Sequence, residues 1–164
     1  MFVEFCHVVS ASFEYFVCFL QSVFLDMYVK TVLNAKDKPT QALGEAFLPI
    51  FMHIDHEDFK TLVFPSCVKM LKRNPEIVLE SIGELLKSVN LDLSKYAAEF
   101  LSVVLPQARH SDEGRRVRAL DIIGCLSQKS SDPDTQSSMF NAIKNVIGGW
   151  FLLLCFLLCC FILM

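Results

Sequence analysis

The feature that most constrains this chain is an internal repeat of 41 residues. Moving the sequence by that distance places Pro65 on Pro106 and Gly83 on Gly124. Apolar positions within each unit recur at steps of three and four residues, which is the helical period. The pattern predicts two helices per unit, the first with a proline late in its course and the second with a glycine at its middle. Four apolar pairs share the register: Phe59 with Phe100, Leu79 with Leu120, Ile82 with Ile123, and Leu85 with Leu126.

The proline and the glycine of each unit lead to separate expectations. A proline inside a helix removes a backbone hydrogen bond, so we expect the first helix of each unit to kink near Pro65 and Pro106. A glycine inside a helix costs about 1 kcal/mol relative to alanine, so we expect Gly83 and Gly124 to allow close approach of a neighbouring helix. Units of two helices with a period near 40 residues are typical of HEAT and armadillo repeats.

The sequence therefore predicts an all-α fold: a right-handed α-solenoid of about three HEAT-type helical hairpins, followed by a hydrophobic C-terminal helix. A weaker first unit is indicated by an offset of 36 that places Pro39 on Pro75 and Leu43 on Leu79. Coincidental alignment of two helix pairs is the alternative. One pair cannot bury its own apolar face, so we expect the outer helices to expose apolar side chains. The expected helices cover residues 27–35, 40–53, 56–72, 75–89, 94–109, 112–129 and 133–147.

Two of these helices begin with the same local sequence pattern. Asn74-Pro75-Glu76 and Asp132-Pro133-Asp134 each combine an N-cap residue, a proline at the first helical position and an acid in the first turn. We therefore expect Asn74 and Asp132 to cap the helices that follow them.

Charge divides the chain into three zones. The formal net charge is −3, which argues against a generic nucleic-acid binder, because such proteins carry a strong basic excess. We expect an apolar, partly aberrant N-terminal segment at 1–26, a HEAT-repeat solenoid fragment at 27–147 and a hydrophobic tail at 148–164. Residues 146–164 carry no charge and are long enough to cross the ~30 Å core of a bilayer. The tail is therefore either a transmembrane anchor or translated intron sequence, and we favour the second.

The N-terminal segment is a poor secretion signal, because it has no basic region and Glu4 and Glu14 interrupt its apolar run. The seven cysteines are scattered without a CxxC pair, so they form neither a disulfide framework nor a zinc site. We expect a cytoplasmic protein in which Cys67 and Cys125 are reduced core residues.

Five segments between residues 27 and 147 together resemble one protein family: His56–Phe59, Val68–Ser81, Val89–Ala97, Leu105–Glu113 and Cys125–Thr135. They resemble the N-terminal part of the very large translational activators of the general-control pathway (the Gcn-type stalled-ribosome sensors), in their plant form. The resemblance extends over roughly residues 26–149, and both ends of the chain depart from it.

The resemblance implies a cytoplasmic HEAT-repeat scaffold that associates with ribosomes and translation factors. Proteins of this family activate the kinase that phosphorylates the alpha subunit of translation initiation factor two when amino acids run short. Their kinase-binding segment lies far to the C-terminal side of the region matched here. The resemblance therefore implies that this chain holds part of the N-terminal solenoid.

We find no catalytic or cofactor-binding motif in the sequence: a phosphate-binding loop, a dinucleotide-binding glycine motif and a nucleophile elbow are all absent. We therefore expect no enzymatic activity, no cofactor and no small-molecule substrate. The one dense cluster of candidate metal ligands is His53–Asp58, where His53 and His56 lie one turn apart. We prefer a capping role for Asp55 and solvated positions for the residues after it, and expect no metal.

Two basic groups are the candidate binding residues. Consecutive units of a solenoid place equivalent turns in a row along one edge. Lys72, Arg73, Arg115 and Arg116 lie at equivalent turns, so they form a candidate basic stripe for ribosomal phosphates. The alternative, which we favour, is a solvated edge on which these cations complement helix C-termini and nearby acids.

Two other functions are consistent with the pattern. The first is a membrane-anchored helical adaptor that binds protein partners through the solenoid surface and the membrane through residues 146–164. The second is a tubulin-binding module of the TOG class, which rests on architecture alone.

Overall fold

The computed structural model describes residues 20–147, and this part of the chain contains helices and turns but no strand. Its first helix covers 20–33 and ends in a π-helical stretch, η1 (Val29–Leu33). The elements that follow are α2 (Gln41–Glu45), α3 (Leu48–Phe51), α4 (His56–Asp58), η2 (Phe59–Val63), α5 (Phe64–Arg73), α6 (Pro75–Ser88), α7 (Ser94–Ala108), α8 (Glu113–Gln128) and α9 (Pro133–Ile147).

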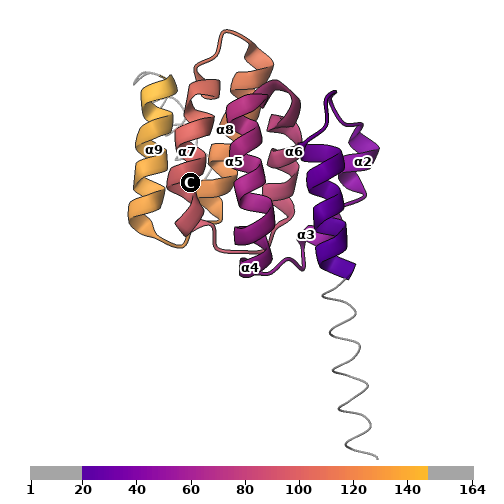
Figure 1. The fold of residues 1–164 in the computed structure, drawn as a ribbon. Coiled ribbons are helices and arrows are strands. Elements are labelled where there is room, and N and C mark those ends of the chain that lie inside the picture. The colour runs from indigo at the N-terminus through magenta and orange to yellow at the C-terminus, as the bar shows by residue number, and fades with distance from the viewer. Residues whose placement is uncertain (1–19, 148–164) are drawn as a thin grey trace, which may run out of the picture.

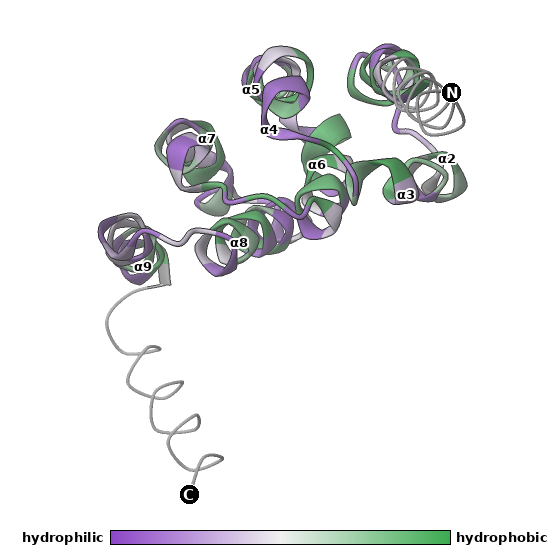
Figure 2. Ribbon diagram, turned by 90° about the horizontal axis from the view of Figure 1, so that it is seen from below, coloured by the Kyte–Doolittle hydropathy of each residue, from purple (hydrophilic) through white to green (hydrophobic). Residues whose placement is uncertain are grey.

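The helices form two layers, seen end-on in Figure 2. The first helix, the run from α4 to α5, α7 and α9 form what we call the A layer. The elements α2, α3, α6 and α8 form the B layer. Neighbours within each layer pack together, and α6 and α8 each pack against the A helix that precedes them. The prediction of an all-α helical-repeat fold is therefore confirmed.

The turns fall on two edges (Figure 1). The turns that lead from an A helix to a B helix lie at the top of that view, at 34–40, Asn74 and 109–112; we call this the upper edge. The turns that lead from a B helix back to an A helix lie at the bottom, at 52–55, 89–93 and 129–132; we call this the lower edge.

The core runs continuously between the layers and joins successive units through aromatic contacts. Phe59 and Phe100, the pair related by the repeat, are both fully buried. The Phe64 ring contacts Tyr96 at 4.8 Å and Phe100 at 5.2 Å between centroids, and so connects α5 to α7. Burial of apolar side chains between stacked units is what stabilises a solenoid, since no unit has a closed core of its own.

Four of the expected helices match the structure to within one residue at either end: those at 75–89, 94–109, 112–129 and 133–147. The expectation that outer helices expose apolar side chains is also confirmed. Phe140 on α9 is 50% exposed and Met27 on the first helix is 41% exposed.

The expected first helix, 27–35, is wrong at its start. Helical structure is already present at residue 20, and Leu25 is fully buried in the core. Residues 20–26 are therefore part of the first A-layer helix, and Leu25 packs in the core.

The expected single helix at 40–53 is also wrong, because a turn at 46–47 divides it into α2 and α3. Pro49 lies in the first turn of α3, where its missing N–H has no helical partner to lose. A proline at this position cannot donate to the carbonyl of Glu45 four residues back, and its ring would clash there, so one helix cannot run through 45–49. After the break, Phe47 and Phe51 both contact Tyr28 edge-on, at 5.3 and 4.7 Å between centroids.

The proline of the second unit widens its helix. Pro65 has no N–H to donate to the carbonyl four residues back, and its ring would clash with that carbonyl. The preceding five residues, η2, are accordingly π-helical, and the N–H of Phe64 donates to the carbonyl of Phe59, five residues back. The expected distortion at Pro65 is therefore a π-helical segment.

The expected close approach at the two glycines is not found. A Cβ on Gly83 would meet Cγ1 of Ile122 at 3.7 Å, which is ordinary contact, and a Cβ on Gly124 would meet nothing within 4 Å. The side chain of Asn74 makes no cap hydrogen bond either, so the expected cap holds at Asp132 alone, whose Oδ2 accepts from the N–H of Thr135 at 2.9 Å.

The hydrophobic tail at 148–164, expected as a transmembrane or intron-derived helix, lies outside the described residues. Between residues 20 and 147, no helix combines the length and the apolar character that crossing a bilayer requires.

Candidate functional site

The upper edge carries the predicted basic stripe, and the structure brings two of its turns into contact. Arg115, in the first turn of α8, forms an ion pair with Glu76, in the first turn of α6. Equivalent turns of units two and three therefore lie side by side, as the repeat predicts. The four predicted residues divide into two pairs with different surroundings.

Arg115 and Arg116 are committed to the fold. The side chain of Arg115 is 21% exposed, and its guanidinium pairs with Glu76 and lies 2.9 Å from Nε2 of His110. Arg116 donates from Nη1 to the carbonyl oxygens of His110, at 3.1 Å, and Ser111, at 2.6 Å. These donors hold the turn between α7 and α8 in place, so the Arg115 guanidinium and Nη1 of Arg116 are engaged in contacts within the fold.

Lys72 and Arg73 have the opposite character. They are the last two residues of α5 and are both exposed. Within the described part of the chain neither forms an ion pair or a side-chain hydrogen bond. Cations in this position complement the partial negative charge of a helix C-terminus and still present their charged ends to solvent.

Two further cations join Lys72 and Arg73 on the upper edge. Lys36 lies in the 34–40 turn and Arg109 directly follows α7, and both are exposed without a partner among the described residues. The exposed basic row thus has a member at each of the three turns: Lys36, Lys72, Arg73 and Arg109. Prediction from the sequence left Lys36 and Arg109 out of the site, although a cation just after each A helix is a readable signal.

An ion-pair network lies beside the upper edge and connects three units. Glu80 of α6 accepts from Lys38 at 2.5 Å and lies 3.3 Å from Nη2 of Arg118 on α8. The hydrogen bond from Lys38, aided by the charges of Lys38 and Arg118, lowers the pKa of Glu80 against the opposing effect of burial. Lys38 and Arg118 are therefore structural cations.

On the lower edge, hydrogen bonds from short polar side chains connect neighbouring turns. Asp92 Oδ1 accepts from the N–H and the Oγ of Ser94, at 3.0 and 2.6 Å, and from the N–H of Ser131 at 3.2 Å. Asp92 Oδ2 accepts from Oγ of Ser131 at 2.6 Å. Hydrogen bonds from Ser131 and Ser94 hold the pKa of Asp92 well below its usual range.

A lysine adds further hydrogen bonds to this network, which we call the lower-edge lattice. Lys129 donates from Nζ to the carbonyl of Lys87 at 2.6 Å and to that of Val89, and so caps the C-terminus of α6 from the following unit. Its own carbonyl accepts from the N–H of Leu93 at 2.9 Å. Burial lowers the pKa of Lys129. The lattice was not predicted from the sequence, because the partners that it joins across turns are about 40 residues apart.

The His53–Asp58 cluster forms a helix start. Oδ1 of Asp55 accepts from the N–H of Asp58 at 2.7 Å, which confirms the expected cap. His53 and His56 are exposed. Among the described residues, no group of three or more His, Cys, Asp or Glu side chains is arranged to hold a metal ion.

Cys67 and Cys125 are free thiols in the core, as expected. Burial raises the pKa of both, most strongly for Cys67, which is fully buried. A neutral, buried thiol is a poor nucleophile, so these two side chains act as small apolar core residues.

Comparison with known proteins gives a consistent result. A family described as "Stalled ribosome sensor GCN1 N-terminal" matches residues 21–150. Protein ILITYHIA of Arabidopsis thaliana is 56% identical over 129 residues, which is 79% of this chain and 5% of the relative. The Stalled ribosome sensor GCN1 of Homo sapiens and that of Mus musculus are each 32% identical over the same length and shares. The chain thus spans about a twentieth of these relatives' length. No solved structure matches it.

Proposed function

Because the chain belongs to the family of the stalled ribosome sensor GCN1, within its N-terminal region, we propose that it is part of a non-enzymatic helical-repeat scaffold for translational control. The scaffold acts in the cytoplasm, associates with ribosomes and supports activation of the kinase that phosphorylates the alpha subunit of initiation factor two. The observation that carries the proposal is the family match over 21–150, and the repeat fold supports it.

The exposed row at the upper edge is the part of this chain that we propose to touch ribosomal RNA. Lys72 and Arg73 hold free positive charge at the end of α5, and Lys36 and Arg109 extend it to the neighbouring turns. Scattered cations on turns recognise phosphates and carry no base code. The contact we propose is therefore electrostatic and independent of RNA sequence.

Co-sedimentation of the chain with purified eukaryotic ribosomes tests this contact. The variant Lys72→Ala/Arg73→Ala should weaken binding at low salt, and the loss should shrink as salt rises. Each phosphate contact steepens the plot of log affinity against log salt by roughly 0.7–0.9. The matched control is Lys60→Ala/Lys95→Ala, which removes the same charge from exposed positions early in the A helices. Equal binding by both variants and the unchanged chain would refute the upper-edge contact.

Starvation signalling provides the second test. We expect the kinase-binding segment to lie outside the region matched here, so an excess of this chain should occupy ribosomes without activating the kinase. Expression of the chain in plant cells should then reduce phosphorylation of the alpha subunit after amino-acid withdrawal. The Lys72→Ala/Arg73→Ala variant should reduce it less. Unchanged phosphorylation, with the chain bound to ribosomes, would contradict a role in this pathway.

A further inference from the structure

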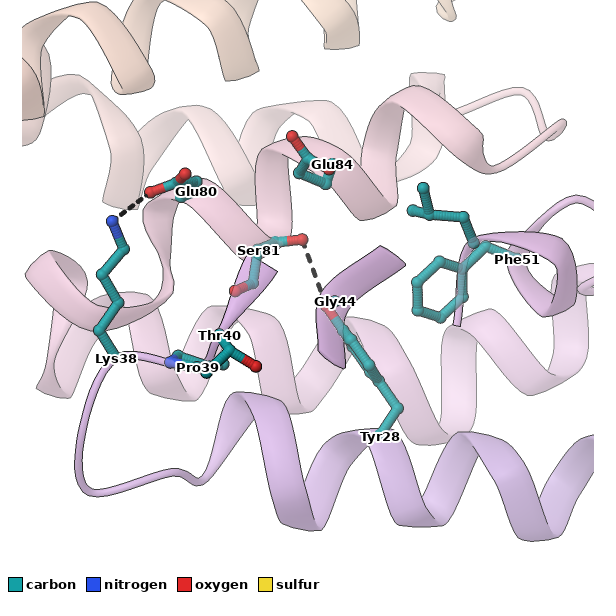
Figure 3. Close-up of a pocket in the computed structure, with 10 residues that line it drawn as sticks. Tyr28, Lys38, Pro39, Thr40, Gly44, Phe51, Glu80, Ser81 and Glu84 are labelled. Atoms are coloured by element: carbon teal, nitrogen blue, oxygen red, sulfur yellow. Dashed lines mark hydrogen bonds and ion pairs between the residues drawn. The ribbon is translucent and has the colours of Figure 1, made fainter. Parts of the chain in front are cut away.

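A cavity lies between the first and second units and borders the 34–40 turn of the upper edge. Its volume is about 350 Å³, at the lower end of the range for ligand sites. Its walls come from the first helix, the 34–40 turn, α2, α3 and α6 (Figure 3). The space is therefore framed by parts of two units, and its shape depends on how they stack.

The floor of the cavity is apolar and already assembled. Tyr28 and Phe51 contact edge-to-face with centroids 4.7 Å apart, and Leu48 lies beside them. The hydroxyl of Tyr28 donates to the carbonyl of Ser81 at 3.2 Å, so the ring is fixed and its polar end is satisfied (Figure 3). Gly44 leaves the wall open, since a Cβ there would meet nothing within 4 Å.

Two carboxylates of α6 border the cavity, and they differ in their partners. Glu80 is neutralised by Lys38 and Arg118. Glu84, one turn further along α6, forms no ion pair or side-chain hydrogen bond within the described residues. Lys87 lies on the far side, in a second hollow toward α8 that shares Glu80 and Glu84 with the first. The border of the cavity therefore carries one uncompensated negative charge.

We propose that this cavity binds the side chain of a lysine or an arginine from an extended basic segment of a partner protein. The aliphatic stem lies on Leu48 and Phe51, and the cationic end meets the carboxylate of Glu84. A long cationic side chain is the one natural side-chain type that matches an apolar floor with an anionic border. An anion is repelled by the carboxylates, and an apolar side chain would bury Glu84 without a partner.

The second hollow gives the segment a direction. Its charged lining residues are three acids, Glu80, Glu84 and Asp121, and two cations, Lys87 and Arg118. Arg118 pairs with Glu80, and Asp121 has no ion-pair partner within residues 20–147. An extended segment that places one cation at Glu84 continues from there toward α8, where a second cation meets Asp121. This binding mode uses none of the four cations of the exposed basic row, so it does not depend on whether that row touches RNA.

Fluorescence anisotropy with labelled peptides tests the proposal on the full chain. The probes are three nonapeptides in which glycine alternates with arginine, lysine or glutamate. The arginine or the lysine peptide should bind, and the glutamate peptide should not. Glu84→Gln should weaken binding of the basic peptide five- to tenfold. The control Glu99→Gln removes the same charge from an exposed site on α7 and should leave binding within twofold.

A second variant tests the cavity separately from charge. Gly44→Leu directs a side chain into the open space and should abolish binding, while Gly44→Ala should reduce it partly. Helicity by circular dichroism is measured for each variant. Glu84→Gln removes one half-buried charge and keeps the size of the side chain, so it keeps the proposal falsifiable where Gly44→Leu unfolds the chain. Equal affinity of Glu84→Gln and Glu99→Gln, or unchanged binding by a folded Gly44→Leu, would overturn it. Competition by a uridine oligonucleotide that is lost in Glu84→Gln would also overturn it, because the site would then take RNA.

Discussion

The two edges of this solenoid treat their polar residues in opposite ways. On the lower edge, the polar side chains form hydrogen bonds with the backbone and side chains of the neighbouring turn. These residues are Asp92, Ser94, Lys129 and Ser131. On the upper edge, an ion pair between Arg115 and Glu76 joins the turns of units two and three, and a row of cations is left exposed. Because lower-edge groups are already paired, the upper edge is the one suited to an outside partner.

The difference follows from side-chain length. Aspartate and serine are short, so their oxygens reach only the adjacent backbone, and they bind turns to each other with little loss of side-chain entropy. Lysine and arginine are long and lose more rotamer freedom when fixed. Arg115 and Arg116 are fixed because acceptors lie within reach. Lys72 and Arg73 have no such acceptor and extend into water.

The largest expected effect is on the lower edge. Asp92→Ala removes the acceptor of four hydrogen bonds, which come from Ser94 and Ser131. We expect the free energy of unfolding to fall by about 1–2 kcal/mol, the upper part of the range for lost helix caps. Urea denaturation followed by circular dichroism measures it. The control Asp37→Ala, at an exposed position in the 34–40 turn, should change stability by less than about 0.5 kcal/mol. Equal effects of the two substitutions would remove the distinction between the edges.

The same carboxylate predicts a pH dependence. The folded pKa of Asp92 is depressed by its hydrogen bonds, whereas the unfolded value is ordinary, about 3.9. Its contribution is therefore fully present above the unfolded pKa and is lost as pH falls toward the folded pKa. We expect the stability difference between the unchanged chain and Asp92→Asn to be constant from neutral pH to about pH 5 and to shrink below about pH 4. Urea midpoints at a series of pH values measure it, and a difference that widens in acid would contradict the assignment.

The upper-edge ion pair should have a smaller effect. Arg115→Ala and Glu76→Gln each remove the ion pair that joins the first turns of α6 and α8. Ion pairs at exposed positions contribute about 0.2–1 kcal/mol and are screened by salt. In a double-mutant cycle, we expect a coupling energy of about 0.5 kcal/mol that falls as salt rises. A coupling energy as large as the loss of stability in Asp92→Ala would mean that contacts between turns stabilise both edges equally.

The sequence predicted the fold best where local pattern and packing agree. Helices α6 to α9 have regular apolar faces and clear starts at Pro75, Ser94, Asp112 and Pro133, and their bounds were found to within one residue. The expected helix at 40–53 is wrong because Pro49 cannot continue the helical hydrogen bonds, so the chain turns at 46–47 before α3 begins. The apolar pattern continues across this break and does not reveal it.

The positive charge of the candidate site could be predicted from the sequence, but the ion-pair partners of its residues could not. A cation near a turn is visible in the sequence, yet Arg115 and Lys72 look alike there. They differ because Arg115 forms an ion pair with Glu76, which is 39 residues earlier in the sequence and lies on the adjacent turn of the fold, whereas Lys72 has no such partner among the described residues. The lower-edge lattice was missed for the same reason, since Asp92 and Ser131 are 39 residues apart. Those residues are also common turn formers, and they gave no signal that distinguished them from an ordinary loop.

The smallest expected effect on stability is at Lys72 and Arg73, the residues that we propose to contact the ribosome. Lys72→Ala/Arg73→Ala removes two exposed charges that have no partner within residues 20–147, so stability should lose only their favourable interaction with the C-terminus of α5, about 0.3–0.5 kcal/mol. Thermal unfolding at low and high salt measures it, and the loss should vanish at high salt because the interaction is screened. Arg116→Ala is the matched comparison, since its two hydrogen bonds to carbonyls of the 109–112 turn should make it the more destabilising change and leave its cost insensitive to salt. If the double variant unfolds more readily than Arg116→Ala, Lys72 and Arg73 hold the fold together. The upper edge would then have no free cations at α5 to offer a partner.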